Sequence, residues 1–221
     1  MAKVYLSPSD QESNVYAYDN TNEAVQCGRI AEACRAALER SGVEVKVGHM
    51  ISMAQKCSES NAFGADLHVP VHTNAFNGKV MGTRMFCYSA GGKGMAACKA
   101  IFARLAPITP GESENIQVNA DYYEVRVPAA PTAYIECEFH DTVEGAKWIV
   151  ENTVLIGDTI ARGICDYFGV TFKEPEQPKP PAGATIYRVQ VGAYAKKENA
   201  ENMLAKLKKD GYSGFIVEGK L

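Results

Sequence analysis

The sequence has no long apolar run and no excess of basic residues. Its 221 residues include 23 Lys and Arg and 26 Asp and Glu, which gives a formal net charge of -3. A nucleic-acid-binding surface needs clustered basic residues to neutralise phosphates, and the sequence shows no such cluster along its main part. No segment approaches the roughly 18 apolar residues that cross a bilayer. We therefore expect neither nucleic acid nor a membrane as a partner.

The cysteines and the first residues of the sequence lead to two further expectations. Seven cysteines are an odd number, and none of them forms a Cys-x-x-Cys pair. We therefore expect buried free thiols rather than a disulfide framework or a Cys-rich metal site. The first residues, MAKVYLSPSDQ, lack the apolar stretch of a secretory signal. This predicts synthesis in the cytoplasm without a signal peptide.

Strand-like and helix-like segments alternate along most of the chain. Short apolar or alternating segments predict strands at 3–6, 43–48, 65–75, 82–89, 122–127 and 132–139. Apolar residues spaced three and four apart predict a helix from the NTNE segment to near Gly42, and further helices are expected at 52–64, where Gly64 ends the helix, and at 92–105 and 143–168. This order predicts an α/β fold with a mixed, mostly parallel sheet and helices on both faces. Ligands of such sheets bind at the carboxyl ends of the strands.

A proline-rich segment divides the chain. Prolines recur at 175, 178, 180 and 181, which is typical of an extended linker. We expect a catalytic domain at 1–171, a linker at 172–184 and a small strand-helix-strand module at 185–221. A module of 37 residues is short for a self-sufficient core.

Three residues are expected to meet at the carboxyl edge of the sheet. Glu23 lies at the start of the first helix, His72 ends the strand that also carries His68, and Glu136 lies in the YIECEF segment, followed by His140. An acidic residue inside a covered strand is costly without a partner, which favours a functional role for Glu136. His68 lies about 13 Å deeper in its strand, at roughly 3.3 Å per residue, and is expected to support the site or belong to the core.

This set has the composition of a mononuclear zinc hydrolase site. Such a site uses nitrogen and oxygen ligands, leaves one position open for water, and places a free carboxylate nearby to take the proton of that water. Each residue also has an ordinary structural explanation. Glu23 would favour the positive end of a helix dipole in any protein, and a histidine often ends a strand in a simple hydrogen bond.

The order of these segments resembles that of the zinc-dependent N-acetylmuramoyl-L-alanine amidases of bacterial cell walls and phage lysins. VPVHTNA is similar to the ISIHANA segment of that family, and YIECEF is similar to its LVExGF segment, over residues 3–170. The resemblance implies a six-stranded sheet and hydrolysis of the amide between N-acetylmuramic acid and L-alanine in peptidoglycan. It also implies that Glu23 and His72 bind Zn²⁺ and that Glu136 is the general base.

The chain departs from the family at one ligand. The family places its first zinc-binding histidine in a DPGHGG segment, and this sequence has SPSDQ there, with Asp10 at the position of the histidine. We expect His140 to be the third metal ligand, and Asp10 and His68 remain alternatives. The substitution leaves a second interpretation open, namely a catalytically inactive peptidoglycan-binding protein that has lost a zinc ligand.

The tail has a resemblance of its own. YRVQVGAYAKKENAENMLAKLKKDGYSGFIV resembles the first half of a SPOR domain, a module that binds the glycan strands of peptidoglycan. The expected partner is therefore peptidoglycan, both its glycan strand and its stem peptide. The expected place of action is the cell wall, after release of the protein, as for an endolysin. A hydrolase with a Ser or Cys nucleophile is disfavoured, because no G-x-S-x-G segment is present.

Overall fold

The computed structural model describes residues 1–114, 116–175, 189–209, 212 and 214–219. The chain divides into two compact units, Met1–Pro175 and Glu176–Leu221. Phe172 packs against the core of the first unit, and the backbone N–H of Lys173 donates to Ser41 Oγ at 3.0 Å. The segment 172–175, which we assigned to the linker, therefore belongs to the first unit.

The first unit is built on a six-stranded sheet with the order β2-β1-β3-β6-β4-β5. Its strands are β1 (Lys3–Pro8), β2 (Glu44–Val47), β3 (Leu67–Asn74), β4 (Arg84–Cys87), β5 (Gln117–Val118) and β6 (Tyr134–Phe139). Neighbouring strands run parallel except β4 and β6, which are antiparallel. The expectation of a mixed, mostly parallel sheet is confirmed.

Six helices cover this sheet. They are α1 (Glu23–Arg40), α2 (Met53–Phe63), α3 (Lys93–Leu105), α4 (Tyr123–Arg126), α5 (Val143–Glu151) and α6 (Thr153–Phe168). Helix α1 begins where the Asn22 side chain accepts from the Val25 amide, and α2 ends at Gly64, whose φ of 68° is left-handed. None of the described helices is long and apolar enough to span a membrane.

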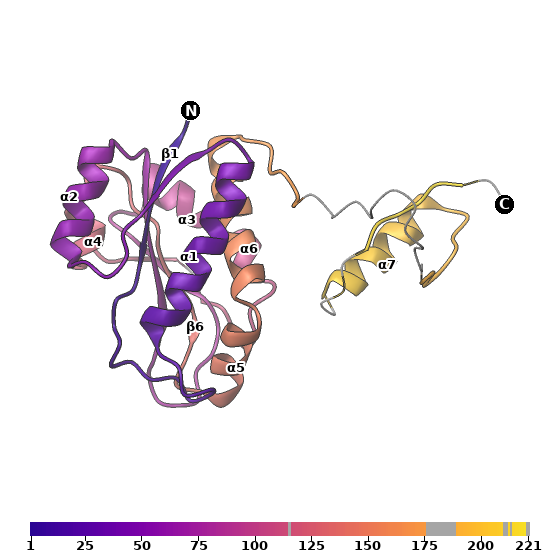
Figure 1. The fold of residues 1–221 in the computed structure, drawn as a ribbon, viewed down its shortest axis with the longest axis horizontal. Coiled ribbons are helices and arrows are strands. Elements are labelled where there is room, and N and C mark those ends of the chain that lie inside the picture. The colour runs from indigo at the N-terminus through magenta and orange to yellow at the C-terminus, as the bar shows by residue number, and fades with distance from the viewer. Residues whose placement is uncertain (115, 176–188, 210–211, 213, 220–221) are drawn as a thin grey trace, which may run out of the picture. The chain divides into compact units, whose positions relative to one another are not determined.

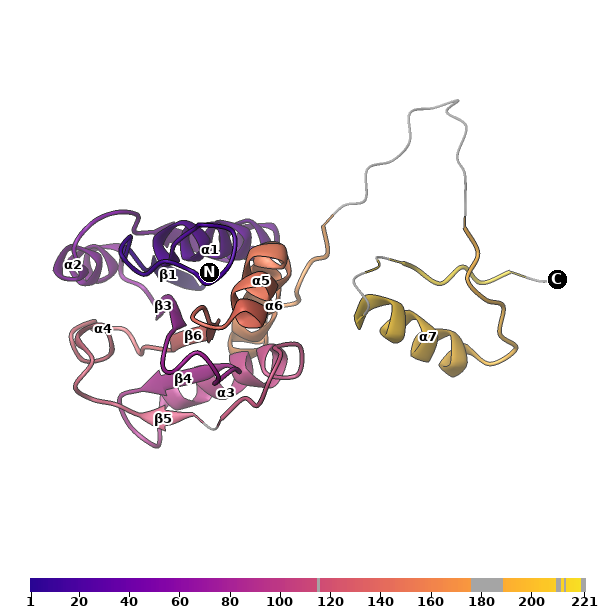
Figure 2. The same ribbon diagram turned by 90° about the horizontal axis from the view of Figure 1, so that it is seen from below.

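The two faces of the sheet differ in chemistry. Figure 2 shows α1, α3, α5 and α6 on one side of the sheet and α2 and α4 on the other. The first side is the apolar core, to which the strands contribute Val4, Leu6, Val69, Val71, Met85, Cys87, Ile135 and Cys137. The alternate strand residues face α2 and α4, and they include Tyr5, Ser7, His68, His72, Arg84 and Glu136. We call this second side the polar face of the sheet.

Two expected elements differ from the structure. The YYEVRV segment, expected as a strand, forms the short helix α4, and the sixth strand is the two-residue β5 instead. Alternating aromatic and β-branched residues suggested a strand, but buried polar contacts of Glu124 hold this segment against β1 and β3. The seven cysteines are free and buried, as expected.

The second unit contains helix α7 (Lys197–Lys209). The described residues on either side of it, 189–196 and 214–219, form no strand, so the expected strand-helix-strand is not found there. Part of the first expected strand, including Ile186, lies outside the described residues. A short strand needs a hydrogen-bonded partner, and a single two-stranded unit is marginally stable. Figure 1 shows α7 in yellow.

Candidate functional site

Glu23 and His72 meet at the carboxyl end of β3. Oε1 of Glu23 lies 2.9 Å from Nδ1 of His72, and both side chains are buried. Helix α1 begins at Glu23, so its carboxylate lies beside the positive end of the helix dipole. The neighbouring loop holds the carboxylate in place, because Nδ2 of Asn14 donates to Glu23 Oε2 at 2.6 Å. The expected pairing of these two residues at the sheet edge is found.

Glu136 lies beside His72 on the polar face. The β3–β6 register pairs His72 with Glu136, and the ring of His72 stacks on Tyr134 with centroids 4.8 Å apart. The Glu136 side chain is 9% exposed. The structure therefore brings Glu23, His72 and Glu136 to one edge of the sheet, from one helix and two neighbouring strands.

Two buried polar atoms in this site have no hydrogen-bond partner in the part of the chain that the structure describes. Among the described residues, the buried side-chain atoms without a hydrogen bond include Nε2 of His72 and Oε2 of Glu136. Most buried polar atoms in proteins are hydrogen-bonded, so unpartnered ones at adjacent positions indicate a place where another group binds. One is the ring nitrogen of His72 that does not contact Glu23, and the other is a carboxylate oxygen on the neighbouring strand.

The charges in the site perturb its pKa values. Burial raises the pKa of Glu136 to about 8, with His72 lowering it and Glu23 raising it further. Burial works against ionisation of Glu23, but hydrogen bonds from His72, Asn14 and Ser9 hold its pKa below the ordinary value. The pKa of His72 is raised: burial lowers it, but the hydrogen bond to Glu23 and the charge of Glu136 outweigh that effect. Two carboxylates with opposite pKa shifts are suited to different tasks.

His140 lies in a separate contact. Its Nδ1 is 2.9 Å from Oγ1 of Thr73, and its ring stacks on Tyr16 with centroids 4.9 Å apart. Glu23, His72 and His140 do not form a group whose ligand atoms all lie within 4.8 Å of one another; within the described part of the chain, Cys57, His68 and Glu124 form such a group. The role of His140 as a ligand remains a prediction.

The two alternative ligands also have other partners. Asp10 faces the buried Lys56, with 3.7 Å between Oδ2 and Nζ. His68 is fully buried and contacts Ser60 and Glu124, which agrees with its expected supporting or core position. His49, the remaining histidine, forms a contact at the surface, where its Nε2 lies 2.6 Å from Oε1 of Glu32.

Sequence reasoning missed several residues around the Glu23–His72 pair. Nε2 of Gln11 lies 3.5 Å from His72 Nδ1, and the Thr73 amide donates to Glu23 Oε1 at 3.3 Å. Asn14 belongs to the polar, Asn-rich loop after β1. This composition was the only sign in the sequence that the loop supports the Glu23–His72 pair. Gln11 comes directly after Asp10, the residue at which the sequence departs from the family. A polar side chain from that segment therefore does reach the Glu23–His72 pair.

Comparisons with known proteins identify the family of the chain. A family model described as N-acetylmuramoyl-L-alanine amidase matches residues 9–166, which is more than half of the chain. The chain belongs to this amidase family. The match includes the segments that carry Glu23, His72, Glu136 and His140. A SPOR domain model matches residues 170–218, so the amidase domain is followed by a SPOR module.

Two curated relatives are named as N-acetylmuramoyl-L-alanine amidases. The chain is 23% identical over 224 residues to the N-acetylmuramoyl-L-alanine amidase CwlM of Bacillus licheniformis, covering 98% of this chain and 85% of the relative. It is 22% identical, with the same coverage, to the sporulation-specific N-acetylmuramoyl-L-alanine amidase of Bacillus subtilis (strain 168).

Solved amidase structures share the fold. The catalytic domain of CwlV from Bacillus (Paenibacillus) polymyxa var. colistinus superposes with a TM-score of 0.70 at 16% identity, covering 77% of this chain and 100% of that one. AmiC2 of Nostoc punctiforme gives 0.67 at 17% identity, covering 76% and 97%. The α/β fold inferred from the sequence is therefore that of the amidases.

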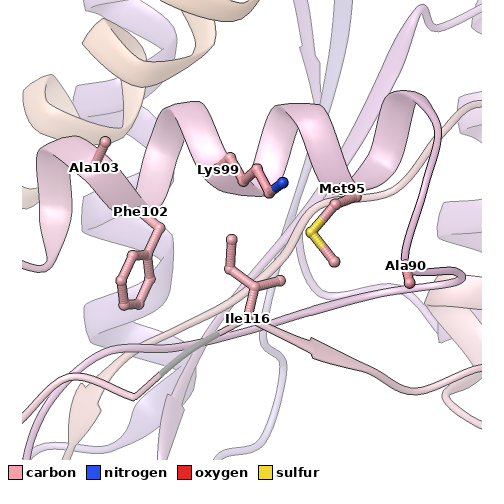
Figure 3. A pocket seen from close by; sticks show the side chains of 6 residues that line it. All are labelled: Ala90, Met95, Lys99, Phe102, Ala103 and Ile116. Carbon is pink, nitrogen blue, oxygen red and sulfur yellow. The ribbon is translucent and has the colours of Figure 1, made fainter.

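A pocket elsewhere on the amidase domain has a different character. It lies beside α3 and is lined by Ala90, Met95, Lys99, Phe102, Ala103 and Ile116 (Figure 3). These residues are mostly apolar, and none belongs to the candidate site. The chemistry of the domain is therefore expected at the edge of the sheet, where the buried carboxylates and imidazole meet, and not in this pocket.

Proposed function

We propose that this chain is a zinc-dependent N-acetylmuramoyl-L-alanine amidase that hydrolyses the bond between N-acetylmuramic acid and the L-alanine of the stem peptide. Family membership supports the reaction. The observation that supports the site is the convergence of Glu23, His72 and Glu136 at the carboxyl edge of the sheet, with a buried carboxylate oxygen of Glu136 that has no hydrogen-bond partner among the described residues.

The donor set fits a zinc ion. Imidazole nitrogen and carboxylate oxygen bind zinc at about 2.0–2.2 Å, so two such ligands of a tetrahedral ion stand roughly 3.3 Å apart. Oε1 of Glu23 and Nδ1 of His72 are 2.9 Å apart, so only a small adjustment is needed for both atoms to bind one ion. We propose that these two side chains hold the ion. His140 is retained as the predicted third ligand, with Asp10 as an alternative. Gln11 contacts His72 through its amide nitrogen, so it would have to turn its amide oxygen towards the pair to compete for this role.

When bound, a zinc ion activates water and polarises a carbonyl. The protein's own contribution is to place and move protons. Glu136 is proposed as the general base that takes a proton from the attacking water and later gives it to the leaving amino group of L-alanine. Burial raises the pKa of Glu136, whereas a nearby cation lowers the pKa of a carboxyl group, so a bound ion would favour the ionised form that can accept a proton. Tyr134 limits the movement of the His72 ring by stacking on it.

The SPOR module is proposed to hold the enzyme on peptidoglycan glycan strands. The match to the SPOR family supports this role. Attachment through a second unit raises the local concentration of substrate around the amidase domain without adding a contact at the active site. The proposed place of action is the cell wall.

Metal analysis and a wall digestion test this function together. The purified protein is expected to contain zinc and to release new L-alanine amino termini from isolated cell walls. Treatment with a chelator should stop the release, and added zinc should restore it. A protein that binds walls but contains no zinc and releases no amino termini would instead be the inactive wall-binding protein.

A further inference from the structure

A second group of metal-binding side chains lies on the polar face, away from the proposed active site. Cys57 of α2, His68 of β3 and Glu124 of α4 bring a thiol, an imidazole and a carboxylate together, with one ligand atom of each within 4.8 Å of the others. They share no residue with the Glu23–His72 pair. His68 and His72 are four residues apart on one strand, which is about 13 Å at roughly 3.3 Å per residue.

The group is closed to solvent. Cys57 is 1% exposed, His68 is 0% exposed and Glu124 is 2% exposed. Burying ionisable groups costs free energy unless they have binding partners. The imidazole, the carboxylate and the thiol therefore each need a partner in the interior. Structural zinc sites are closed to solvent, whereas catalytic zinc keeps a position open for water, and thiolate, imidazole and carboxylate groups all bind zinc.

Contacts around the group hold its ligand atoms in place. Nδ1 of His68 lies 3.0 Å from Oγ of Ser60, which leaves Nε2 directed at Glu124. A metal-binding histidine usually donates its other ring N–H to a neighbouring acceptor in this way. The hydroxyl of Ser7 donates to the same carboxylate oxygen of Glu124, so both residues are oriented from outside the group.

The spacing of His68 and Glu124 also suits a shared ion. Nε2 of His68 lies 3.3 Å from Oε1 of Glu124. A charge-assisted hydrogen bond is normally about 2.7–2.9 Å long, so this contact is long for a buried ion pair. Two ligands of a tetrahedral zinc ion stand roughly 3.3 Å apart.

We propose that Cys57, His68 and Glu124 bind a second metal ion, a zinc ion with a structural role. The ion joins α2, β3 and α4, three elements that are distant in the sequence. It also secures the segment that leads into β6, because Thr132 Oγ1 donates to the Glu124 carbonyl and the Ala133 amide donates to the His68 carbonyl. Glu136 follows three residues later, so the ion holds the start of the strand that carries the proposed base.

Cobalt substitution tests this site separately from the proposed active site. The full chain is produced in zinc-depleted medium with Co²⁺, and its metal content and near-ultraviolet spectrum are recorded. A cobalt–thiolate bond gives a charge-transfer band, whereas ligation by carboxylate and imidazole does not. Since the active-site candidates include no cysteine, we expect the band to come from Cys57 alone.

Two variants complete the experiment. Cys57→Ser is expected to abolish the band and to lose one metal ion per chain, while Cys165→Ser, a buried cysteine of α6, keeps both. Glu23→Gln is expected to keep the band, so failure of the proposed active site would leave this result unchanged. The absence of a thiolate band from the cobalt-grown wild-type protein would overturn the proposal without reference to any variant. A band that persists in folded Cys57→Ser protein would also overturn it.

Discussion

Nδ1 of His72 lies 2.9 Å from Oε1 of Glu23, although 49 residues separate them in the chain. One comes from the end of β3 and the other from the first turn of α1, and the register of β6 places Glu136 beside them. The fold thus assembles two carboxylates and an imidazole in a buried position. Because isolated buried charges are costly, this arrangement is expected to depend on a cation.

Removal of the Glu136 carboxylate should stop hydrolysis without unfolding the protein. Gln has nearly the same shape but cannot accept and return the proton, so Glu136→Gln should lower kcat by about 100-fold to 10,000-fold. Release of L-alanine amino termini from cell walls gives the rate, and zinc content should stay unchanged.

Glu138→Gln is the matched control for this variant. Glu138 is another buried carboxylate of β6, and its oxygens accept from the amides of Gly82 and Phe139. A Gln oxygen preserves such a bond, so hydrolysis should remain within a few-fold of the wild type. Equal losses in both variants would show that the strand, and not the Glu136 proton, was disturbed.

Zinc binding should depend on Glu23 and His72. Loss of a group that merely supports a metal ligand typically costs 10–100-fold in affinity, so Glu23→Gln and His72→Ala should each weaken zinc binding by more than about 100-fold. Competition with a chelating dye measures this affinity directly. His49→Ala, which removes a surface imidazole paired with Glu32, should leave zinc binding unchanged. Wild-type affinity in the His72 variant would refute the proposed site.

The third ligand can be identified by the same titration. His140→Ala should weaken zinc binding if the sequence-based prediction is correct, although His140 Nδ1 now contacts Thr73. Gln11→Ala tests the neighbour that lies 3.5 Å from His72 Nδ1. A loss of affinity in the Gln11 variant, with none in the His140 variant, would assign the position to Gln11 and show the prediction to be wrong.

The sequence predicted the fold better than the contacts of the site. Residue spacing identified α1, α3 and most strands, because one face of each is largely apolar, whereas α2 was recognised as a helix that ends at Gly64. It failed at 122–127, where the same alternation of aromatic and β-branched residues forms the helix α4. Glu124 is buried against His68, which lies 56 residues away in the chain, and this contact holds the segment in place. A local sequence pattern does not encode a contact between such distant residues.

The candidate site was predictable only in part for a related reason. Glu23 begins α1, and His72 and Glu136 are paired on the neighbouring strands β3 and β6, so topology was enough to bring the three together. The position of His140 depends on a change of register between β3 and β6 after His72, where Asn74 pairs with Phe139. Such an irregularity re-aims the side chains that follow it, and the sequence gives no sign of it.

Helix packing against α6 should be sensitive to a single methyl group. A Cβ at Gly157 would lie 2.6 Å from both Ala33 Cβ and the Ile30 carbonyl oxygen of α1. Gly157→Ala should therefore lower the free energy of unfolding by about 1–3 kcal/mol, despite the higher helix propensity of Ala. Urea denaturation measures the change.

Gly28→Ala provides the matched control in α1. A Cβ at Gly28 meets nothing within 4 Å, so only the helix propensity changes. This variant should raise the free energy of unfolding by up to about 1 kcal/mol. A stabilising effect in both variants would mean that α1 and α6 are not in the close contact described here.

Removal of the SPOR module should separate wall binding from hydrolysis. The variant should end after Pro175, because Phe172 packs on the core and the Arg40 and Arg162 guanidinium groups lie over its ring. Residues 1–175 form a compact unit, so hydrolysis of soluble peptidoglycan fragments should be retained. Sedimentation with intact cell walls should show weaker binding than for the full chain, since the second attachment is lost. Unchanged sedimentation would remove the wall-binding role from the module, and a parallel loss of activity on soluble fragments would show that it supports the amidase domain instead.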